Sequence, residues 1–131
     1  MFWRRKPSVL IVEDHDPLRL ALGEMLTKAG YSVIVSAHGD EASEILMTHH
    51  FDLLITDIFM PDVDGYALIN RLRTRMDPAR RPKVIVMSGG QQRGLLTDDT
   101  ITVLRRSVDA FLRKPMPKRI FLNTIYTVLN A

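Results

Sequence analysis

Cysteine is absent from the 131 residues, which excludes a disulfide framework, a thiolate zinc site and a cysteine nucleophile. The absence fits a reducing compartment, so we expect a cytoplasmic protein. Long apolar runs are also missing, because the longest has only a few residues and a membrane helix needs ~20. The start, Met1–Pro7, is too short and too charged for a signal peptide.

The glycine-rich signatures of nucleotide-binding loops are missing as well. Neither Gly-x-Gly-x-x-Gly nor Gly-x-x-x-x-Gly-Lys occurs, so no phosphate-cradling loop is predicted. Aromatic residues make up only 7%, and none lies among the cations between Arg71 and Lys83. Proteins that bind single-stranded nucleic acid stack bases on aromatic rings. Direct binding of nucleic acid is therefore not expected.

Charge is distributed unevenly along the chain. Residues 1–66 hold eleven acids and five bases, whereas residues 67–131 hold four acids and thirteen bases. A basic half can attract nucleic acid or an acidic protein partner. The alternative, which we favour, is a solvated surface with one acidic cluster.

Short apolar runs alternate with segments of helical spacing, which predicts alternating strands and helices. The predicted strands are Val9–Val12, Tyr31–Ala37, Leu53–Ile55, Val84–Met87 and Ala110–Leu112. The predicted helices are 16–29, 40–49, 66–75, 98–106 and one that begins at Pro117. Asp16 is expected to cap the first helix, and Gly30 is expected to end it. This pattern predicts an α/β fold: one doubly wound domain over residues 1–131, with a five-stranded parallel sheet in the order 2-1-3-4-5.

Polar side chains follow four of the predicted strands, at the edge where open α/β sheets bind ligands. They are Glu13 and Asp14, Asp57, Ser88 and Lys114. Clustered carboxylates repel one another unless a cation lies among them, and Mg²⁺ prefers such oxygen ligands. With Lys114 as a second positive charge, the site would stabilise a phosphoryl group, and Asp57 is the candidate nucleophile.

Each residue also has an ordinary interpretation. A single Asp after a strand is usually a cap, and Lys114-Pro115 or Ser88-Gly89-Gly90 alone is a loop or turn. Asp62 and Asp64 are expected to form turns. His38, His49 and His50 lack ligand spacing and are expected at the surface. His15 lies beside the acids and could ligate a metal, although one histidine in one loop is weak evidence for a metal site. The functional interpretation depends on matched residue types at four strand ends of one sheet.

The sequence resembles the receiver domain of two-component response regulators. The resemblance covers about residues 8–130, and it is specific because its elements occur together and in order. The matching elements are 9–14, Asp57, 60–65, Ser88-Gly89 and 111–115. The resemblance implies the flavodoxin-like fold of five βα units.

The resemblance further implies that Asp57 accepts a phosphoryl group from the phosphohistidine of a sensor histidine kinase or phosphotransfer protein. Such receivers are switches, not classical enzymes, although they promote their own phosphorylation and slow dephosphorylation. Asp14 and Asp57 would ligate Mg²⁺, or Mn²⁺, directly.

The other site residues have implied roles too. Glu13 would help to hold the metal through water, and the Phe59 carbonyl would complete its protein ligands. Lys114 and Ser88 would bind phosphoryl oxygens, and Ser88 would be coupled to Phe111 as a switch. Phe59 and Gly89 would form the lip of the site. Phosphorylation would then change contacts with a downstream protein.

Some positions depart from the pattern of the family. Phe111 stands where tyrosine is common, and Ser107 where glycine is frequent before the fifth strand. Residues 91–94 lengthen the loop after Ser88. Phe59 is large and apolar, so we expect it to shield the aspartyl phosphate from water and to prolong its lifetime.

Other interpretations stay open. Met1 and the end at Ala131 favour a stand-alone regulator or phosphorelay intermediate over a fragment of a larger DNA-binding regulator or hybrid kinase. An aspartate-nucleophile phosphatase of the haloacid-dehalogenase type is the alternative from another class. That class needs a second acid two residues after the nucleophile, and Phe59 cannot transfer a proton.

Overall fold

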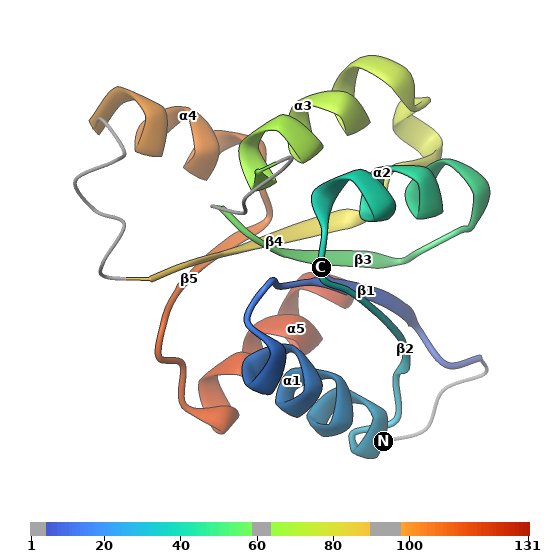
Figure 1. The fold of residues 1–131 in the computed structure, drawn as a ribbon, viewed down its shortest axis with the longest axis vertical. Coiled ribbons are helices and arrows are strands. Elements are labelled where there is room, and N and C mark those ends of the chain that lie inside the picture. Colours follow the sequence, from blue (N-terminus) through green and yellow to red (C-terminus); the bar gives the residue numbers. More distant parts are fainter. Residues whose placement is uncertain (1–4, 59–63, 90–97) are drawn as a thin grey trace.

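In the computed structural model, residues 5–58, 64–89 and 98–131 are described. Strands and helices alternate along the chain, as the sequence predicts (Figure 1). The strands are β1 (Ser8–Val12), β2 (Ser32–Ser36), β3 (Leu53–Asp57), β4 (Lys83–Ser88) and β5 (Ala110–Arg113). The helices are α1 (Asp16–Lys28), α2 (Gly39–Thr48), α3 (Gly65–Arg75), the short 3₁₀ helix η1 (Pro78–Arg80), α4 (Asp98–Ser107) and α5 (Lys118–Leu129).

The five strands form one parallel sheet in the order β2-β1-β3-β4-β5, which confirms the predicted α/β class and strand order. Every residue of β3 is buried, and so is β1 after its first residue. Burial on both faces explains why these strands appear in the sequence as continuous apolar runs without polar alternation.

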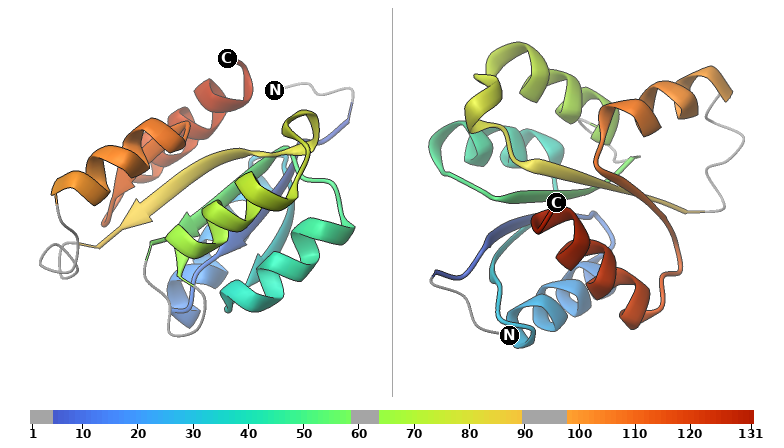
Figure 2. Two further views of the ribbon diagram at one scale, coloured as in Figure 1. Left: turned by 90° about the horizontal axis from the view of Figure 1, so that it is seen from above. Right: turned by 180° about the vertical axis from the view of Figure 1, so that it is seen from behind.

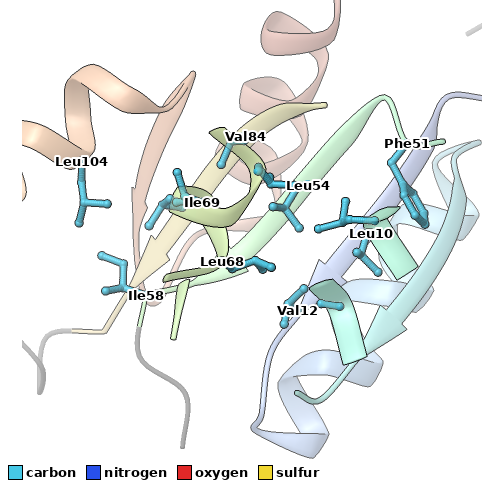
Figure 3. Packing of buried hydrophobic residues seen from close by; sticks show 13 residues of the cluster. Leu10, Val12, Phe51, Leu54, Ile58, Leu68, Ile69, Val84 and Leu104 are labelled. Carbon is cyan, nitrogen blue, oxygen red and sulfur yellow. The ribbon is translucent and has the colours of Figure 1, made fainter. Parts of the chain in front are cut away.

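Helices cover both faces of the sheet (Figures 1 and 2). On one face, α1 and α5 pack against side chains such as Val9 and Ile11. On the other face, side chains of α2, α3 and α4 belong to a second core that contains Leu10 and Val12. Figure 3 shows this second core, where Leu104 of α4 lies near Ile69 of α3. Successive strand residues therefore enter different cores, and a shift by one residue would exchange them.

Helix α1 begins differently from the prediction. Asp16 was expected as its N-cap, but Asp16 is the first helical residue and His15 occupies the cap position without a side-chain hydrogen bond. The Asp16 carboxylate instead accepts a bond of 2.6 Å from Arg19. The predicted end is confirmed, because Gly30 has a φ of 101°, a conformation that glycine adopts without steric cost.

Asp52 joins the start of β1 to the start of β3. Its Oδ2 accepts from the backbone N–H of Ser8 at 2.7 Å and from the Arg5 guanidinium at 3.0 Å. His50 Nε2 lies 3.4 Å from its Oδ1. Burial raises the pKa of this carboxyl, but these donors outweigh burial and hold the pKa below its usual range. The charged carboxylate is therefore favoured in the folded state.

We expect Asp52→Asn to lower the free energy of unfolding at neutral pH by on the order of 1 kcal/mol, since a charged acceptor is lost. The pKa of Asp52 is lower in the folded than in the unfolded state. Asp52 therefore contributes to the free energy of unfolding at pH values above its unfolded pKa, and this contribution is lost as the pH falls through its folded pKa. The variant should thus lose less stability on acidification. Urea unfolding at several pH values between neutral and acid measures the free energy of unfolding of each variant. The control is Glu24→Gln, which removes an exposed ion pair with Lys28. If the free energy of unfolding falls equally with pH in Asp52→Asn and wild type, the stabilising role of the Asp52 charge is contradicted.

Among the described residues, none of the helices combines the length and the apolar character needed to cross a bilayer.

Candidate functional site

Four strand ends bring the predicted polar side chains to one edge of the sheet. Backbone hydrogen bonds extend the strand pairing past the last strand residues and fix these positions. The Glu13 N–H donates to the Ser36 carbonyl at 3.0 Å, and the Lys114 N–H donates to the Ser88 carbonyl at 2.8 Å. Lys114 therefore arrives beside the acids although it lies far from them in sequence. Its peptide bond to Pro115 is cis.

Three carboxylates converge at this edge. Glu13, Asp14 and Asp57 each offer an oxygen, and these oxygens lie within 4.8 Å of one another. Glu13 is fully buried and Asp57 is 3% exposed, whereas Asp14 is open to solvent. Such a group of oxygen ligands, with one open side, suits a hard divalent cation that keeps several waters.

Lys114 bridges the two buried acids. Its Nζ donates to Glu13 Oε1 and, at 3.0 Å, to Asp57 Oδ2. The lysine side chain is itself only 18% exposed. Burial raises the pKa of Glu13, and the contact with Lys114 acts against this rise. For Lys114, burial lowers the pKa, but the two carboxylates outweigh burial and raise it, so the ammonium form is favoured.

One oxygen of Asp57 has no hydrogen-bond partner among the described residues. The buried Oδ1 stands in contrast to Oδ2, which accepts from Lys114. Buried polar atoms are almost always satisfied, and an exception needs an explanation such as an ion or a catalytic role. The residues present therefore fit a metal ion or an incoming electrophile at Asp57.

Sequence reasoning missed a residue that supports the acidic loop. Arg19 is mostly buried, and it donates to the Glu13 carbonyl at 3.1 Å and to Asp16. The loop is also held by the His15 N–H, which donates to Glu13 Oε2 at 3.1 Å. The i,i+3 spacing of Asp16 and Arg19 was the available signal for this contact.

Gly65 was also missed as a feature of the site. Its N–H donates to the Ile58 carbonyl at 2.6 Å, which brings the start of α3 onto the end of β3. A Cβ at this position would lie 2.1 Å from the backbone oxygen of Asp57. Asp64 precedes it and caps α3 by accepting from the Ala67 N–H, so the expected turn-forming Asp64 is a helix cap.

Of the remaining predicted residues, Ser88 and Phe111 are described and Phe59 is not. Ser88 ends β4, and its Oγ–H donates to the Gly89 carbonyl at 3.5 Å, the limit for a hydrogen bond. Phe111 is half-buried in β5, with the Arg105 guanidinium 5.3 Å from its ring. Phe59 and residues 91–94 fall outside the described residues, so the predictions for the metal-binding carbonyl, the shielding ring and the longer loop stay predictions.

An apolar pocket of about 660 Å³ borders the site. Lys114 and Gly89 line its end toward the acids, and side chains of α1 and of the segment after β5 form its walls. These are Leu18, Ala21, Leu22, Met25, Pro115 and Met116. A protein that reaches Asp57 from this side would find apolar surface directly beside it.

Comparison with known proteins places this geometry in a family. Residues 9–126 match the model of the response regulator receiver domain. The probable transcriptional regulator ycf27 of Cyanidium caldarium is 33% identical over 97% of this chain and 48% of its own length. Transcriptional regulatory protein AfsQ1 of Streptomyces coelicolor is 29% identical over 95% of this chain and 52% of its own. The chain thus spans about half the length of these relatives.

Solved structures show the same fold. A putative response regulator from Chloroflexus aurantiacus has a TM-score of 0.82 and 25% identity, covering 97% of this chain and 100% of that one. A CheY-like receiver domain from Methanospirillum hungatei has a TM-score of 0.81 and 25% identity, covering 95% and 94%. The family match over residues 9–126 agrees with the structure, which has five parallel strands in the order 2-1-3-4-5 and acids at their carboxyl ends. The chain belongs to the family of response regulator receiver domains.

Proposed function

We propose that the chain is a single phosphoacceptor domain in which Asp57 receives a phosphoryl group. The observation that carries this proposal is the buried Asp57 Oδ1, which has no hydrogen-bond partner among the described residues, on a carboxylate whose other oxygen contacts Lys114. A carboxylate that needs a ligand and lies beside a cation suits attack on a phosphorylated donor. The donor is the phosphohistidine of a sensor histidine kinase or a phosphotransfer protein.

In the proposed transfer, a carboxylate oxygen of Asp57 attacks phosphorus and the phosphorus–nitrogen bond of phosphohistidine breaks. The bonding electron pair stays on the imidazole nitrogen, and Asp57 becomes an acyl phosphate. Lys114 offsets negative charge on the phosphoryl oxygens, for which it must loosen its contacts with Glu13 and Asp57. Ser88 supplies a hydroxyl donor to another phosphoryl oxygen. Later, water attacks phosphorus, the bond between phosphorus and the Asp57 oxygen breaks, and inorganic phosphate leaves, which regenerates the carboxylate.

Asp14 and Asp57 would hold Mg²⁺, or Mn²⁺, directly, and Glu13 would contribute through water. The three oxygens within 4.8 Å of one another support this assignment. The bound ion would supply positive charge that stabilises the transferred group.

The proposed output is a change in protein contacts. Ser88 and Phe111 lie on the neighbouring strands β4 and β5, and capture of Ser88 by a phosphoryl group would shift the preferred conformer of Phe111. The domain would act through such contacts on a downstream protein. Similarity to the sensor protein EvgS of Escherichia coli, 44% identical over 52% of this chain and 6% of that protein, supports a kinase partnership.

Beryllofluoride, which mimics the phosphoryl group, tests the proposal directly. In the presence of Mg²⁺ it should raise the thermal midpoint of the protein, because a ligand that binds only the folded state stabilises it. ATP and NAD with Mg²⁺ serve as controls and should leave the midpoint unchanged. A rise with ATP or NAD but not with beryllofluoride would identify a nucleotide-binding protein and overturn the proposal.

Asp14→Ala should weaken Mg²⁺ binding more than about tenfold, since even the loss of an outer-shell partner costs that much. The metal-free variant should melt at a higher temperature than wild type, because one of three crowded acids is removed. Calorimetric titration with Mg²⁺ and thermal melts measure the two effects. Glu44→Ala, an exposed acid on α2, is the control. Equal Mg²⁺ affinity in the Asp14 variant and wild type would remove Asp14 from the metal site.

A further inference from the structure

A second feature of the surface lies away from the acidic edge, between α3 and α4. The two helices lie next to each other on the same face of the sheet (Figures 1 and 2), and Arg73 of α3 donates to the Ser107 carbonyl at the end of α4 at 3.4 Å. Two adjoining pockets of about 140 and 40 Å³ occupy this boundary and share Ile69, Arg73 and Ser107. We call them together the α3–α4 groove.

The floor of the groove is apolar and its rim is basic. Ile69, Leu72 and Val84 are buried side chains that line it, and Arg73 and Arg81 stand at its side. The floor therefore suits a single apolar side chain, given the small volumes, and the rim suits anionic groups beside that side chain.

The arginines of this region carry positive charge that the described residues do not neutralise. Arg81 donates to the carbonyls of Met76 at 3.0 Å and Arg73 at 2.6 Å, which fixes its guanidinium without a carboxylate. No ion pair with a described acid occurs for the arginines at the ends of α3, η1 and α4, which are Arg73, Arg75, Arg80, Arg81, Arg105 and Arg106.

Asp109 is the one acid among the described residues that line the groove, and its carboxylate is already engaged. Asp109 accepts from the Val84 N–H at 2.8 Å, and its carboxylate lies 3.9 Å from Lys83. Two of the six arginines, Arg73 and Arg81, line the groove itself. The other four lie at the ends of α3, η1 and α4, where the helix dipole favours cations.

We propose that the α3–α4 groove docks an acidic polypeptide segment, with an apolar side chain on the floor and flanking carboxylates on the arginines. Guanidinium groups form paired hydrogen bonds with carboxylates, so charge and shape both match such a segment. A nucleic-acid duplex would leave the narrow apolar floor unused, and Tyr66 is the single aromatic side chain lining the two pockets, so stacked bases have little platform. This proposal does not depend on phosphorylation of Asp57.

Fluorescence anisotropy with a labelled peptide of about twelve residues, acidic with a central leucine, tests the proposal at low salt. We expect Arg73→Glu to weaken binding about tenfold, because a contact at the rim becomes a repulsion. Arg119→Glu is the matched control: it changes net charge equally on an exposed position of α5, and should weaken binding less than about twofold. Replacing the central leucine by serine at constant peptide charge should weaken binding about fivefold.

Thermal melts verify that Arg73→Glu folds, and Arg73→Gln, which removes the charge without reversing it, should show a smaller loss in the same direction. Equal losses in Arg73→Glu and Arg119→Glu would mean attraction by net charge alone and would overturn the proposal. It is also overturned if the peptide does not bind, or if a DNA duplex of equal charge binds more tightly than the peptide. Asp57→Asn should bind the peptide as wild type does, so failure here is distinguishable from failure of the phosphoacceptor function.

Discussion

Asp57→Asn is expected to reduce phosphorylation to background. The amide carries no negative charge and cannot form the acyl phosphate, so the nucleophile is lost rather than weakened. The side chain keeps its size, and the amide oxygen can still accept from Lys114 in place of Oδ2, so the sheet should remain intact. Incubation with acetyl phosphate and Mg²⁺, followed by intact-mass measurement, quantifies the added phosphoryl group.

The control for this experiment is Asp52→Asn, which removes a partly buried carboxylate at the opposite edge of the sheet. Its labelling should match that of wild type. A thermal melt of each variant separates loss of the acceptor from loss of the fold. If Asp57→Asn is labelled to the extent of wild type, another carboxylate is the acceptor, and Asp14 is then the first to substitute.

Gly65→Ala should destabilise the protein by at least about 3 kcal/mol, the upper part of the range for overpacked cores. The added Cβ would meet backbone atoms, the Asp57 oxygen at 2.1 Å and the Ile58 Cα at 3.0 Å. Backbone cannot rotate away as a side chain does, so the start of α3 and the end of β3 must separate. The thermal midpoint should fall by about 10 °C. Beryllofluoride binding should fall with it, since Asp57 itself is displaced.

Gly23→Ala is the matched control, because it adds the same methyl group to a buried glycine of α1. There the Cβ would lie 3.0 Å from Val35 Cγ1, the end of a side chain that can shift. Alanine also favours the helix interior over glycine by about 1 kcal/mol, which offsets part of the crowding. An unchanged thermal midpoint in Gly65→Ala, or equal losses in the two variants, would show that the contact with Asp57 is not tight.

The order of the strands and helices was predictable because the central strands are buried on both faces. A segment such as Leu53–Ile55 is short and continuously apolar, as a strand buried on both faces should be, and the helices between the strands have apolar positions at a spacing of three and four. The ends of elements were less predictable. Asp16 has the residue type of a cap, but the guanidinium of Arg19 competes for its carboxylate and the helix begins one residue earlier than a cap would allow.

The acidic cluster was predictable from topology, since parallel strands place their carboxyl ends at one edge. The hydrogen bonds between Lys114 and the acids of this cluster were not predictable. Lys114 donates to both Glu13 and Asp57, which lie 101 and 57 positions away in the sequence. These contacts depend on side-chain conformers, and no local sequence pattern encodes them. The contact of Gly65 with the Asp57 carbonyl depends in the same way on the angle at which α3 meets β3.

The position of Asp57 on β3 has a consequence for hydrogen exchange. β3 is buried at every residue and is flanked by β1 and β4, so its amides can exchange only when the sheet as a whole opens. β5 is an edge strand with Ala110 and Phe111 half-buried and Arg113 exposed, so its amides exchange through partial openings of low free energy. Phosphorylation of Asp57, as proposed, would thus act on a strand that opens only at high free energy. We expect the resulting change in amide protection to appear in the edge strand β5 rather than in β3.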